Sequence, residues 1–220
     1  MESSGEKYIK SLIAQGEHQE LDFKFEISDA RKIARTLSAF SNTRGGRLLI
    51  GVKDNGRISG VRSDEEYYMV ESAAALFCKP EVRFKTWSHT VEGKTVLEVY
   101  IPPVTRKPVY ARNEEDRWMA YTRVEDESIL ASIIQLKVWE EAHGTRGKLL
   151  EFTRKEQILL ETLRNSPGTS LTKLQRDTGF PRKEMVQLVT KLVLFDVVEM
   201  GFRDKSAVFS LREKPGEDYR

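Results

Sequence analysis

Apolar and polar residues follow two different periods in the first half of the chain. At 21–26 the apolar positions recur every second residue, which predicts a strand with one charged face. At 29–41 they follow helical spacing, and a Ser-Asp pair precedes them as a cap. The apolar run RLLIGV at 47–52 predicts a buried strand, and a second long helix is expected at 64–78. This mixture predicts an α+β domain.

Turn signals divide the other strands of this half into hairpins. Asp54-Asn55-Gly56 predicts a turn after the buried strand, with a return strand at 58–61. Glu92-Gly93 predicts the turn of a second hairpin. The remaining strands are expected at 82–87, 94–101, 109–111 and 118–123. A short helix is expected to begin near residue 9, and a helix at 128–139 is expected to close the domain.

The second half of the chain has a different pattern. A polar segment at 140–148, EEAHGTRGK, has the composition of a linker. Helical patterns follow at about 154–165, 170–178 and 182–194, and two strands surround a turn at 203–205. Three helices and a hairpin in this order are typical of a winged helix-turn-helix module. The expected division is a first domain at 1–143, a linker at 144–150, a winged-helix domain at 151–212 and a polar tail at 213–220.

Composition limits the classes of function. The 36 basic and 34 acidic residues leave a formal charge of only +2, so a surface that binds nucleic acid must be a local patch. The single cysteine, Cys78, excludes an internal disulfide and a Cys-rich zinc site. The N-terminal sequence lacks the apolar core of a signal peptide, and no apolar run approaches the ~20 residues of a membrane span. We therefore expect a cytoplasmic protein without a membrane partner.

Three motifs carry a resemblance to a known family. They are LDFK at 21–24, SAFSNTRGGRLLIGVKDNGRISGV at 38–61 and KPVYARNEEDRWMAYTRV at 107–124. With these motifs the N-terminal domain resembles the Schlafen-type AlbA domain. The resemblance implies a nucleic-acid-binding module of bacterial type, in a family whose members commonly carry a C-terminal winged helix. Some members are labelled divergent ATPases, but this sequence contains no GxxxxGK[ST] phosphate-binding loop.

The resemblance also implies a catalytic hypothesis. Nuclease members of the Schlafen family use three carboxylates and a divalent metal to cut structured RNA, and Glu17, Asp22 and Asp54 match those positions. Clustered carboxylate oxygens suit Mg²⁺ or Mn²⁺. Asp22 replaces the more usual Glu, which shortens its reach by one methylene. The competing interpretation is that all three are solvated carboxylates of a strand and its turns.

Basic residues surround the same motifs. Cations around the glycine pair and along the late strands can form a track for phosphates. The candidates in the first domain are Arg44, Arg47, Lys53, Arg57, Arg106, Lys107, Arg112 and Arg123. Those in the third helix and the hairpin of the second domain are Arg182, Lys183, Gln187, Lys191, Arg203 and Lys205. The competing interpretation is a solvated charge for each residue of the first domain, and a winged helix used for protein contacts for those of the second.

Two further features have a structural and a functional interpretation. The segment from Asn42 to Gly46 can be a tight helix-to-strand connection, with Asn42 bonded to local backbone, or a phosphate cradle; we favour the connection. Tyr110, Trp118 and Tyr121 can stack on unpaired bases, although aromatic residues in strands more often belong to a core.

These observations lead to one main hypothesis and two alternatives. We expect a DNA-binding transcription regulator in which the winged helix contacts duplex DNA. The AlbA-like domain would add nucleic-acid contact or oligomerisation, no cofactor would be needed, and a homo-oligomer would suit paired half-sites. One alternative is a ribonuclease that uses Glu17, Asp22 and Asp54 with Mg²⁺ or Mn²⁺, and with RNA as the ligand. The other is a protein-interaction adaptor.

Overall fold

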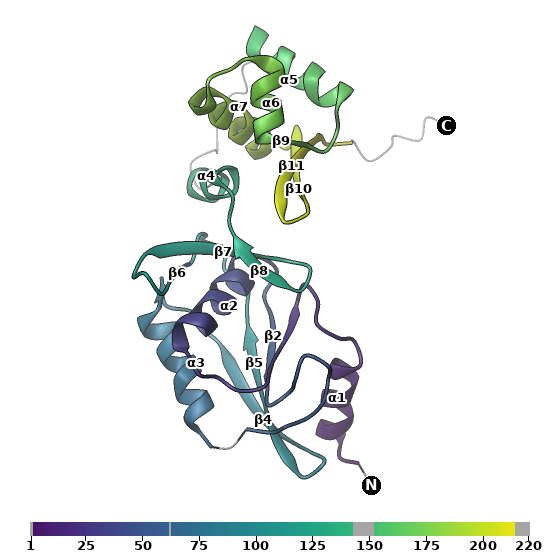
Figure 1. Cartoon of the computed structure of the whole chain (residues 1–220), viewed down its shortest axis with the longest axis vertical. Helices are drawn as coiled ribbons and strands as arrows, with labels where there is room; N and C mark the ends of the chain where they lie inside the picture. Colours follow the sequence, from purple (N-terminus) through teal and green to yellow (C-terminus); the bar gives the residue numbers. More distant parts are fainter. Residues whose placement is uncertain (1, 62, 143–151, 214–220) are drawn as a thin grey trace, which may run out of the picture. The chain divides into compact units, whose positions relative to one another are not determined.

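The computed structural model describes residues 2–61, 63–142 and 152–213 (Figure 1). The chain divides into two compact units, one ending at Ala131 and the other beginning at Ser132. Within the described ranges, no helix is both long enough and apolar enough to cross a membrane.

The described part of the first unit contains two four-stranded sheets and three helices. The helices are α1 (Ser4–Ile13), α2 (Ala30–Asn42) and α3 (Glu65–Leu76). One sheet has the order β1-β2-β5-β4 and consists of β1 (Leu21–Lys24), β2 (Gly46–Ile50), β4 (Lys85–Val91) and β5 (Lys94–Ile101). The other has the order β3-β6-β7-β8 and consists of β3 (Cys78–Lys79), β6 (Tyr110–Arg112), β7 (Trp118–Val124) and β8 (Glu127–Leu130). Only β1 and β2 pair in parallel; the other neighbouring strands are antiparallel. This mixture confirms the α+β class.

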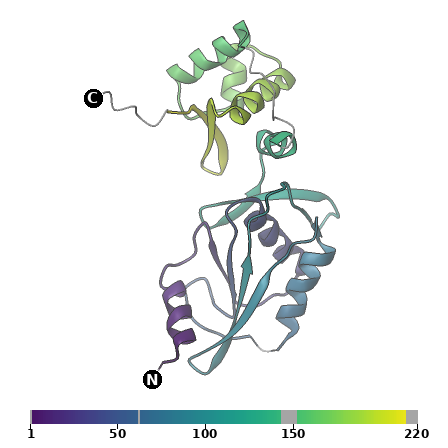
Figure 2. The same ribbon diagram turned by 180° about the vertical axis from the view of Figure 1, so that it is seen from behind.

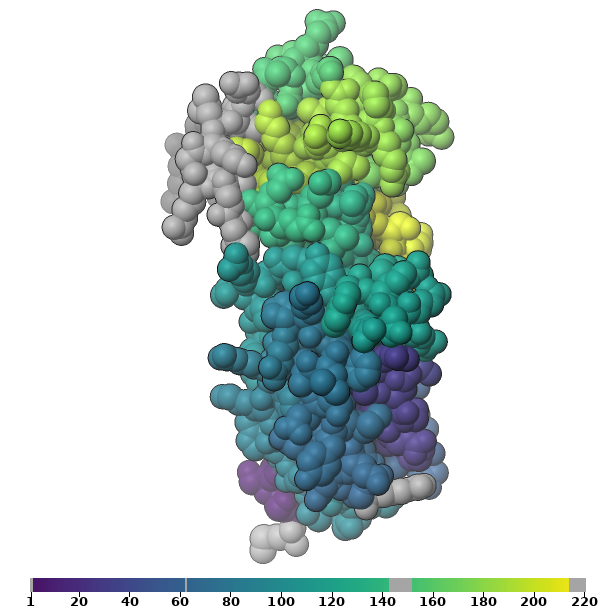
Figure 3. Space-filling model, turned by 90° about the vertical axis from the view of Figure 1, so that its left-hand side faces the viewer, coloured from purple at the N-terminus to yellow at the C-terminus, as the bar shows by residue number. Residues whose placement is uncertain are grey.

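Helices cover both faces of the first sheet (Figures 1 and 2). Ile9 of α1 belongs to a core with Leu49 on one face, whereas Leu37 of α2 belongs to a core with Leu48 on the other. Successive residues of a strand point to opposite faces, so β2 supplies side chains to both cores. Helix α3, in blue, lies on the side of the unit that faces the viewer in Figure 3.

Helix α2 is enclosed by both sheets. It contacts β5 of the first sheet and β6, β7 and β8 of the second, and nine of its 13 residues are buried. Four of the buried residues are polar: Thr36, Ser38, Ser41 and Asn42. A polar group buried without a hydrogen bond costs free energy, so this part of the helix needs polar partners.

Asn42 finds those partners in the second sheet and the segment leading into it. Its amide nitrogen donates to the carbonyl oxygens of Val109 (2.8 Å) and Tyr121 (2.9 Å), and its Oδ1 accepts from the backbone N–H of Val109 (2.7 Å). The Ser38 hydroxyl also donates to the Val109 carbonyl, at 2.8 Å. Asn42 therefore bonds backbone, as expected, but the backbone is 67 and 79 positions away rather than local.

The connection from α2 to β2 leaves no room for side chains at its glycines. Gly45 adopts a φ of +78°, which favours glycine, and a Cβ at Gly46 would lie 2.4 Å from the Phe40 ring. The predicted tight helix-to-strand connection is thus confirmed, and no phosphate cradle is needed to explain the glycines.

Several predicted elements differ from the observed ones. Helix α1 begins at Ser4 rather than near residue 9, and β4 runs to Val91 instead of ending at 87. The return strand expected at 58–61 is reduced to one bridge between Val52 and Ile58. The N–H groups of residues 59 and 60 both donate to the carbonyl of Gly51, so this segment turns instead of extending.

The second unit contains the helices and hairpin that the pattern at 154–211 predicts. Its elements are α4 (Ile133–Glu141), α5 (Arg154–Asn165), β9 (Thr169–Ser170), α6 (Leu171–Thr178), α7 (Arg182–Leu194), β10 (Val198–Arg203) and β11 (Ser206–Leu211). The short strand β9 adds to the hairpin in a sheet of order β10-β11-β9. The core includes Leu159 of α5, Leu174 of α6, Val189 of α7 and Phe209 of β11.

The observed boundary lies before the one expected from the sequence. Residues 127–130 form β8, so the helix expected from 128 begins only at Ile133. Ile134 packs in the core of the second unit, which assigns α4 to that unit and ends the first at Ala131 rather than at 143. The expected linker at 144–150 and all but the first residue of the expected tail at 213–220 lie outside the described residues.

Replacing Asn42 by alanine tests its role between helix and sheets. Asn42→Ala leaves the N–H and C=O of Val109 and the C=O of Tyr121 short of partners, so we expect the free energy of unfolding to fall by about 3 kcal/mol in urea denaturation. Asn55→Ala removes one exposed hydrogen bond, from the Arg57 N–H, which water can replace; it is the control and should change the free energy by less than about 1 kcal/mol. Equal effects of the two substitutions would contradict the role of Asn42.

Candidate functional site

A groove with a volume of about 580 Å³ lies in the first unit. Strand β1, the N-terminal half of α2, the segment after β6, and strands β7 and β8 line it. Its cationic side chains are those of Lys24, Arg31, Lys32, Arg35, Arg112 and Arg123. Its acidic side chains are those of Asp22, Glu114, Glu115, Asp126 and Glu127. Cations therefore slightly outnumber acids in the lining.

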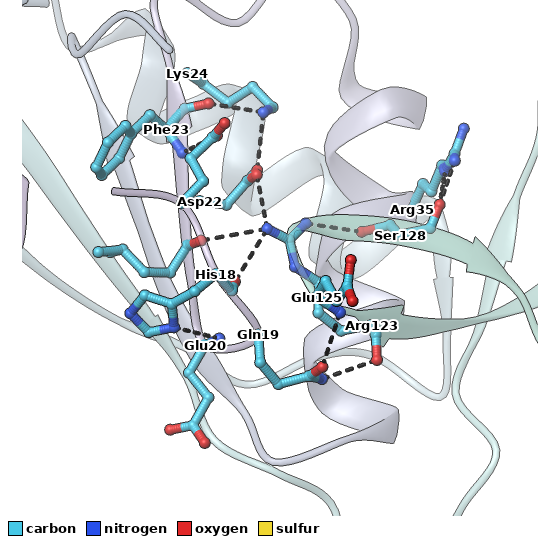
Figure 4. A network of polar contacts seen from close by, with 12 residues as sticks. His18, Gln19, Glu20, Asp22, Phe23, Lys24, Arg35, Arg123, Glu125 and Ser128 are labelled. Atoms are coloured by element: carbon cyan, nitrogen blue, oxygen red, sulfur yellow. Dashed lines mark hydrogen bonds and ion pairs between the residues drawn. The ribbon is translucent and has the colours of Figure 1, made fainter. Parts of the chain in front are cut away.

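A buried ion pair belongs to the lining of this groove, and Figure 4 shows its contacts. Nη2 of Arg123 lies 3.0 Å from Oδ1 of Asp22 and also donates to the Leu21 carbonyl at 3.2 Å. Oδ2 of Asp22 lies 2.8 Å from the Lys24 ammonium. Only 4% of Arg123 and 3% of Asp22 is exposed. Both groups are thus already committed within the protein, and breaking such a pair leaves an uncompensated buried charge.

The three carboxylates of the catalytic hypothesis occupy different environments. Oε1 of Glu17 accepts a hydrogen bond from the Phe23 N–H at 2.8 Å, while Asp22 is held by Arg123 and Asp54 is exposed in a turn. Burial raises the pKa of Glu17, and the neighbouring Asp22 raises it further. The direction of the shift reflects burial and the proximity of the Glu17 and Asp22 carboxylates to each other.

The residues do not fit a three-carboxylate metal site. Throughout the described ranges, no group of three or more His, Cys, Asp or Glu residues is placed to hold a metal ion. The Asp22 carboxylate is compensated by two cationic side chains, Arg123 and Lys24. Glu17, Asp22 and Asp54 therefore do not form a metal centre in this structure.

The rim of the groove is more exposed and carries guanidinium groups. Arg31 and Arg112 both approach Oδ1 of Asp116, at 3.2 and 3.1 Å. Arg35 donates to the Ser128 carbonyl and lies 5.3 Å from the centre of the Tyr121 ring. Tyr121 is buried beneath it, so this aromatic residue belongs to the core and offers no free face for a base.

Three guanidinium groups of the groove have a buried Nε. The Nε atoms of Arg31, Arg112 and Arg123 have no hydrogen-bond partner among the described residues, although that of Arg112 lies 3.1 Å from Oδ1 of Asp116. Lys32, on the first turn of α2, is exposed. Because these Nε atoms are shielded from solvent, an anion that enters the groove first meets the exposed cations of the rim.

Most of the residues that line the groove were not among the candidates from the sequence; Asp22, Arg112, Tyr121 and Arg123 are the exceptions. Of the basic candidates only Arg112 and Arg123 line it. Lys24, Arg31, Lys32 and Arg35 were missed, although the last three recur at positions i, i+1 and i+4 on the polar face of a predicted helix, a signal that could have indicated them.

The other basic candidates of the first unit lie elsewhere. Arg47 pairs with the buried Glu98 at 2.9 Å, Lys53 lies 5.0 Å from the centre of the Phe25 ring, and Lys107 donates to the Thr43 carbonyl at 3.3 Å. Burial lowers the pKa of Lys107. Arg44, Arg57 and Arg106 are exposed outside the groove. Tyr110 is half-buried and Trp118 is 41% exposed.

In the second unit, one helix presents most of the candidates. Arg182, Lys183 and Gln187 are exposed on α7, and Arg203 and Lys205 are exposed where β10 and β11 join. Lys191 differs, because its ammonium lies 2.7 Å from Glu156, whose side chain is 3% exposed. Lys191 is therefore part of an internal ion pair rather than of a polar surface row.

The match to a family model decides the identity of the first unit. The Schlafen AlbA_2 model matches residues 17–132, which include all the groove residues. The chain belongs to the Schlafen AlbA_2 family. The resemblance inferred from the motifs is thereby confirmed, and the groove lies wholly within the family's domain.

Two solved structures are also similar to this chain, at low sequence identity. The DIP2311 protein of Corynebacterium diphtheriae matches at 19% identity with a TM-score of 0.47, over 73% of this chain and 33% of that protein. This chain thus spans about a third of that protein's length. The N-terminal domain of a putative ATP-dependent DNA helicase RecG-related protein of Nitrosomonas europaea matches at 27% identity with a TM-score of 0.43, over 60% of this chain and 95% of that domain. A search of curated proteins gave no match.

The Glu156–Lys191 pair predicts a pH dependence of the second unit. Burial by itself would raise the pKa of Glu156, but the hydrogen bonds from Lys191 and Thr153 lower it to about 2. Because the folded-state pKa lies below the ordinary 4.5, this carboxylate stabilises the fold above about pH 4.5, and the contribution is lost as the pH falls toward 2.

Glu156→Gln should therefore lower the free energy of unfolding by roughly 2 kcal/mol at pH 7 and by much less at about pH 3. Urea unfolding followed by NMR signals of the second unit measures both values. Glu161→Gln, exposed on the same helix, is the matched control and should have little effect at either pH. A Glu156 variant whose loss of stability is the same at both pH values would contradict the assigned ion pair.

Proposed function

We propose that this protein is a nucleic-acid-binding regulator whose groove holds the phosphodiester backbone and whose second unit binds duplex DNA as a winged helix. The observation that carries the proposal is the groove itself, with six cationic side chains inside a Schlafen AlbA_2 domain. The guanidinium groups at its rim, on Arg31, Arg35 and Arg112, are suited to phosphate oxygens.

The lining of the groove favours phosphate over base contacts. Its one aromatic residue, Tyr121, is buried and covered by Arg35, so bases have no stacking platform there. Guanidinium groups on the rim can exchange Asp116 for a phosphate, because an exposed ion pair is worth little. Binding through the groove should therefore tolerate many sequences.

The second unit supports duplex binding by its order of elements. Helices α5, α6 and α7, a turn at Gly179 with a φ of +72° and the hairpin β10–β11 follow the order of a winged helix-turn-helix. In such modules the recognition helix approaches the major groove with its N-terminal residues. In this chain those residues include Arg182 and Lys183, and the wing carries Arg203 and Lys205.

A transcriptional role follows from the combination of two binding units. The second unit would choose the site on duplex DNA, and the groove would add affinity through phosphates. A homo-oligomer suits this role, since paired half-sites match a two-fold axis. The adaptor alternative gains only if neither unit binds nucleic acid.

Charge removal on α7 tests its proposed place against duplex DNA. Arg182→Ala with Lys183→Ala should weaken binding to a DNA duplex, and the slope of log affinity against log salt should become shallower by about 0.9 for each phosphate that the variant no longer neutralises. Arg164→Ala, at the end of α5, is the control for the loss of a positive charge elsewhere in the second unit and should leave the slope unchanged. Fluorescence anisotropy over a salt series measures both. Unchanged affinity in the double variant would remove α7 from the interface.

A separate substitution tests the groove. Lys32→Ala should weaken binding of a labelled DNA duplex by about three- to tenfold at low salt, because one exposed groove cation is removed without changing the core. Lys7→Ala, equally exposed on α1 of the same unit, should leave the affinity unchanged. An equal decrease in the two variants would mean that only the overall charge matters.

A further inference from the structure

The first sheet of the first unit ends in an open strand. β4 lies at the edge of the order β1-β2-β5-β4, and β5 is its only neighbour in that sheet within the described residues. Its seven residues, Lys85–Val91, contain no proline. An edge strand presents unpaired N–H and C=O groups that can pair with another chain, and proteins usually block such edges with prolines, charges or bulges.

The hairpin geometry decides which backbone groups of β4 face outward. Glu92 and Gly93, with φ values of +52° and +73°, form a two-residue turn between Val91 and Lys94, which face each other. The pair that flanks such a turn is hydrogen-bonded, and hydrogen-bonded and non-hydrogen-bonded pairs alternate along an antiparallel ladder. The N–H and C=O groups of Thr86, Ser88 and Thr90 therefore point away from β5.

These outward groups have no assigned partner. In the part of the chain that the structure describes, no backbone hydrogen bond links them to another element. Their side chains are a hydroxyl series without charge, and Ser88 and Thr90 are exposed. The edge thus lacks the blocking charges and prolines at the three positions where they would count most.

We propose that β4 pairs with β4 of a second copy of this chain, antiparallel, about a two-fold axis at Ser88. Ser88 is the midpoint of the strand and also one of its outward-facing residues. In this register all seven residues pair, with Ser88 opposite Ser88 and Thr86 opposite Thr90, each such pair exchanging both of its hydrogen bonds. The two first sheets join into one continuous sheet.

The side chains favour a second copy over an unrelated extended peptide. The register places Trp87 opposite His89 and Lys85 opposite Val91, so no like charges face each other. Thr86 opposite Thr90 is a favourable cross-strand pair, and it occurs on both sides of the axis. Trp87, 45% exposed in the single chain, gains a cross-strand aromatic neighbour. The strand is thus complementary to itself.

This dimer rests on the proposed function in one respect: it would give two copies of each nucleic-acid-binding unit, related by one two-fold axis. Its test needs no nucleic acid. Light scattering of the full chain should give a mass rising with concentration toward twice 25.3 kDa. Ser88→Pro removes only an outward N–H and should give the single-chain mass, while Ser88→Ala, which keeps that N–H, should remain dimeric. A single-chain mass for the wild type across the concentration series would overturn the proposal and leave the nucleic-acid function open.

Cross-linking tests the register without relying on a proline variant. Ser88→Cys places two thiols across the axis, with Cα atoms about 5.5 Å apart, whereas in Thr90→Cys the two equivalent positions lie roughly 14 Å apart. A short bis-maleimide should join the first variant and not the second. The native Cys78 should not react, because burial raises the pKa of its thiol to about 12. Equal cross-linking of the two variants, or none in Ser88→Cys, would overturn the assigned pairing.

Discussion

Hydrogen bonds from the end of α2 to the backbone of the second sheet and its entry segment hold the first unit together. The helix lies between two sheets, so its C-terminal half cannot turn a polar face to water. Asn42 uses both ends of its amide on Val109 and Tyr121, and Ser38 bonds Val109 as well. Few other side chains could replace this arrangement, because it needs a donor and an acceptor within one short side chain. Its consequence is a fixed distance between α2 and strands β6 and β7.

That fixed distance creates the groove. The N-terminal half of α2 forms one wall and the strands that Asn42 anchors form another. Arg123 and Asp22 line the groove as well, and their burial makes this pair a structural element rather than a reactive one. The remaining positive charge is carried by the rim, where Arg31, Lys32 and Arg35 meet solvent. A charge at a rim can release its own partner and accept a ligand, whereas a buried pair cannot do so cheaply.

Local features of the sequence predicted most elements, and long-range contacts explain the failures. Alternation at 21–26 and helical spacing at 29–41 depend on near neighbours, and both predicted the right element. The groove could not be predicted in the same way, because Asp22 and Arg123 are 101 positions apart. This separation also explains the failure of the predicted metal site. The sequence shows that Asp22 is acidic, but it does not show that Arg123 and Lys24 form ion pairs with its carboxylate. The prediction that a helix from residue 128 closes the first domain was wrong for a similar reason. Ile134 of that helix packs with residues that follow it in the sequence, in the core of the second unit.

If the groove of the first unit binds phosphate through the arginines of its rim, Arg31 and Arg35, those side chains must respond to DNA. An NMR titration of the ¹⁵N-labelled full chain with a DNA duplex can follow the side-chain Nε–H signals of Arg31 and Arg35. Both signals should shift in a saturable manner together with those of α7. Shifts confined to α7, with Arg31 and Arg35 unchanged at saturation, would contradict phosphate binding in the groove.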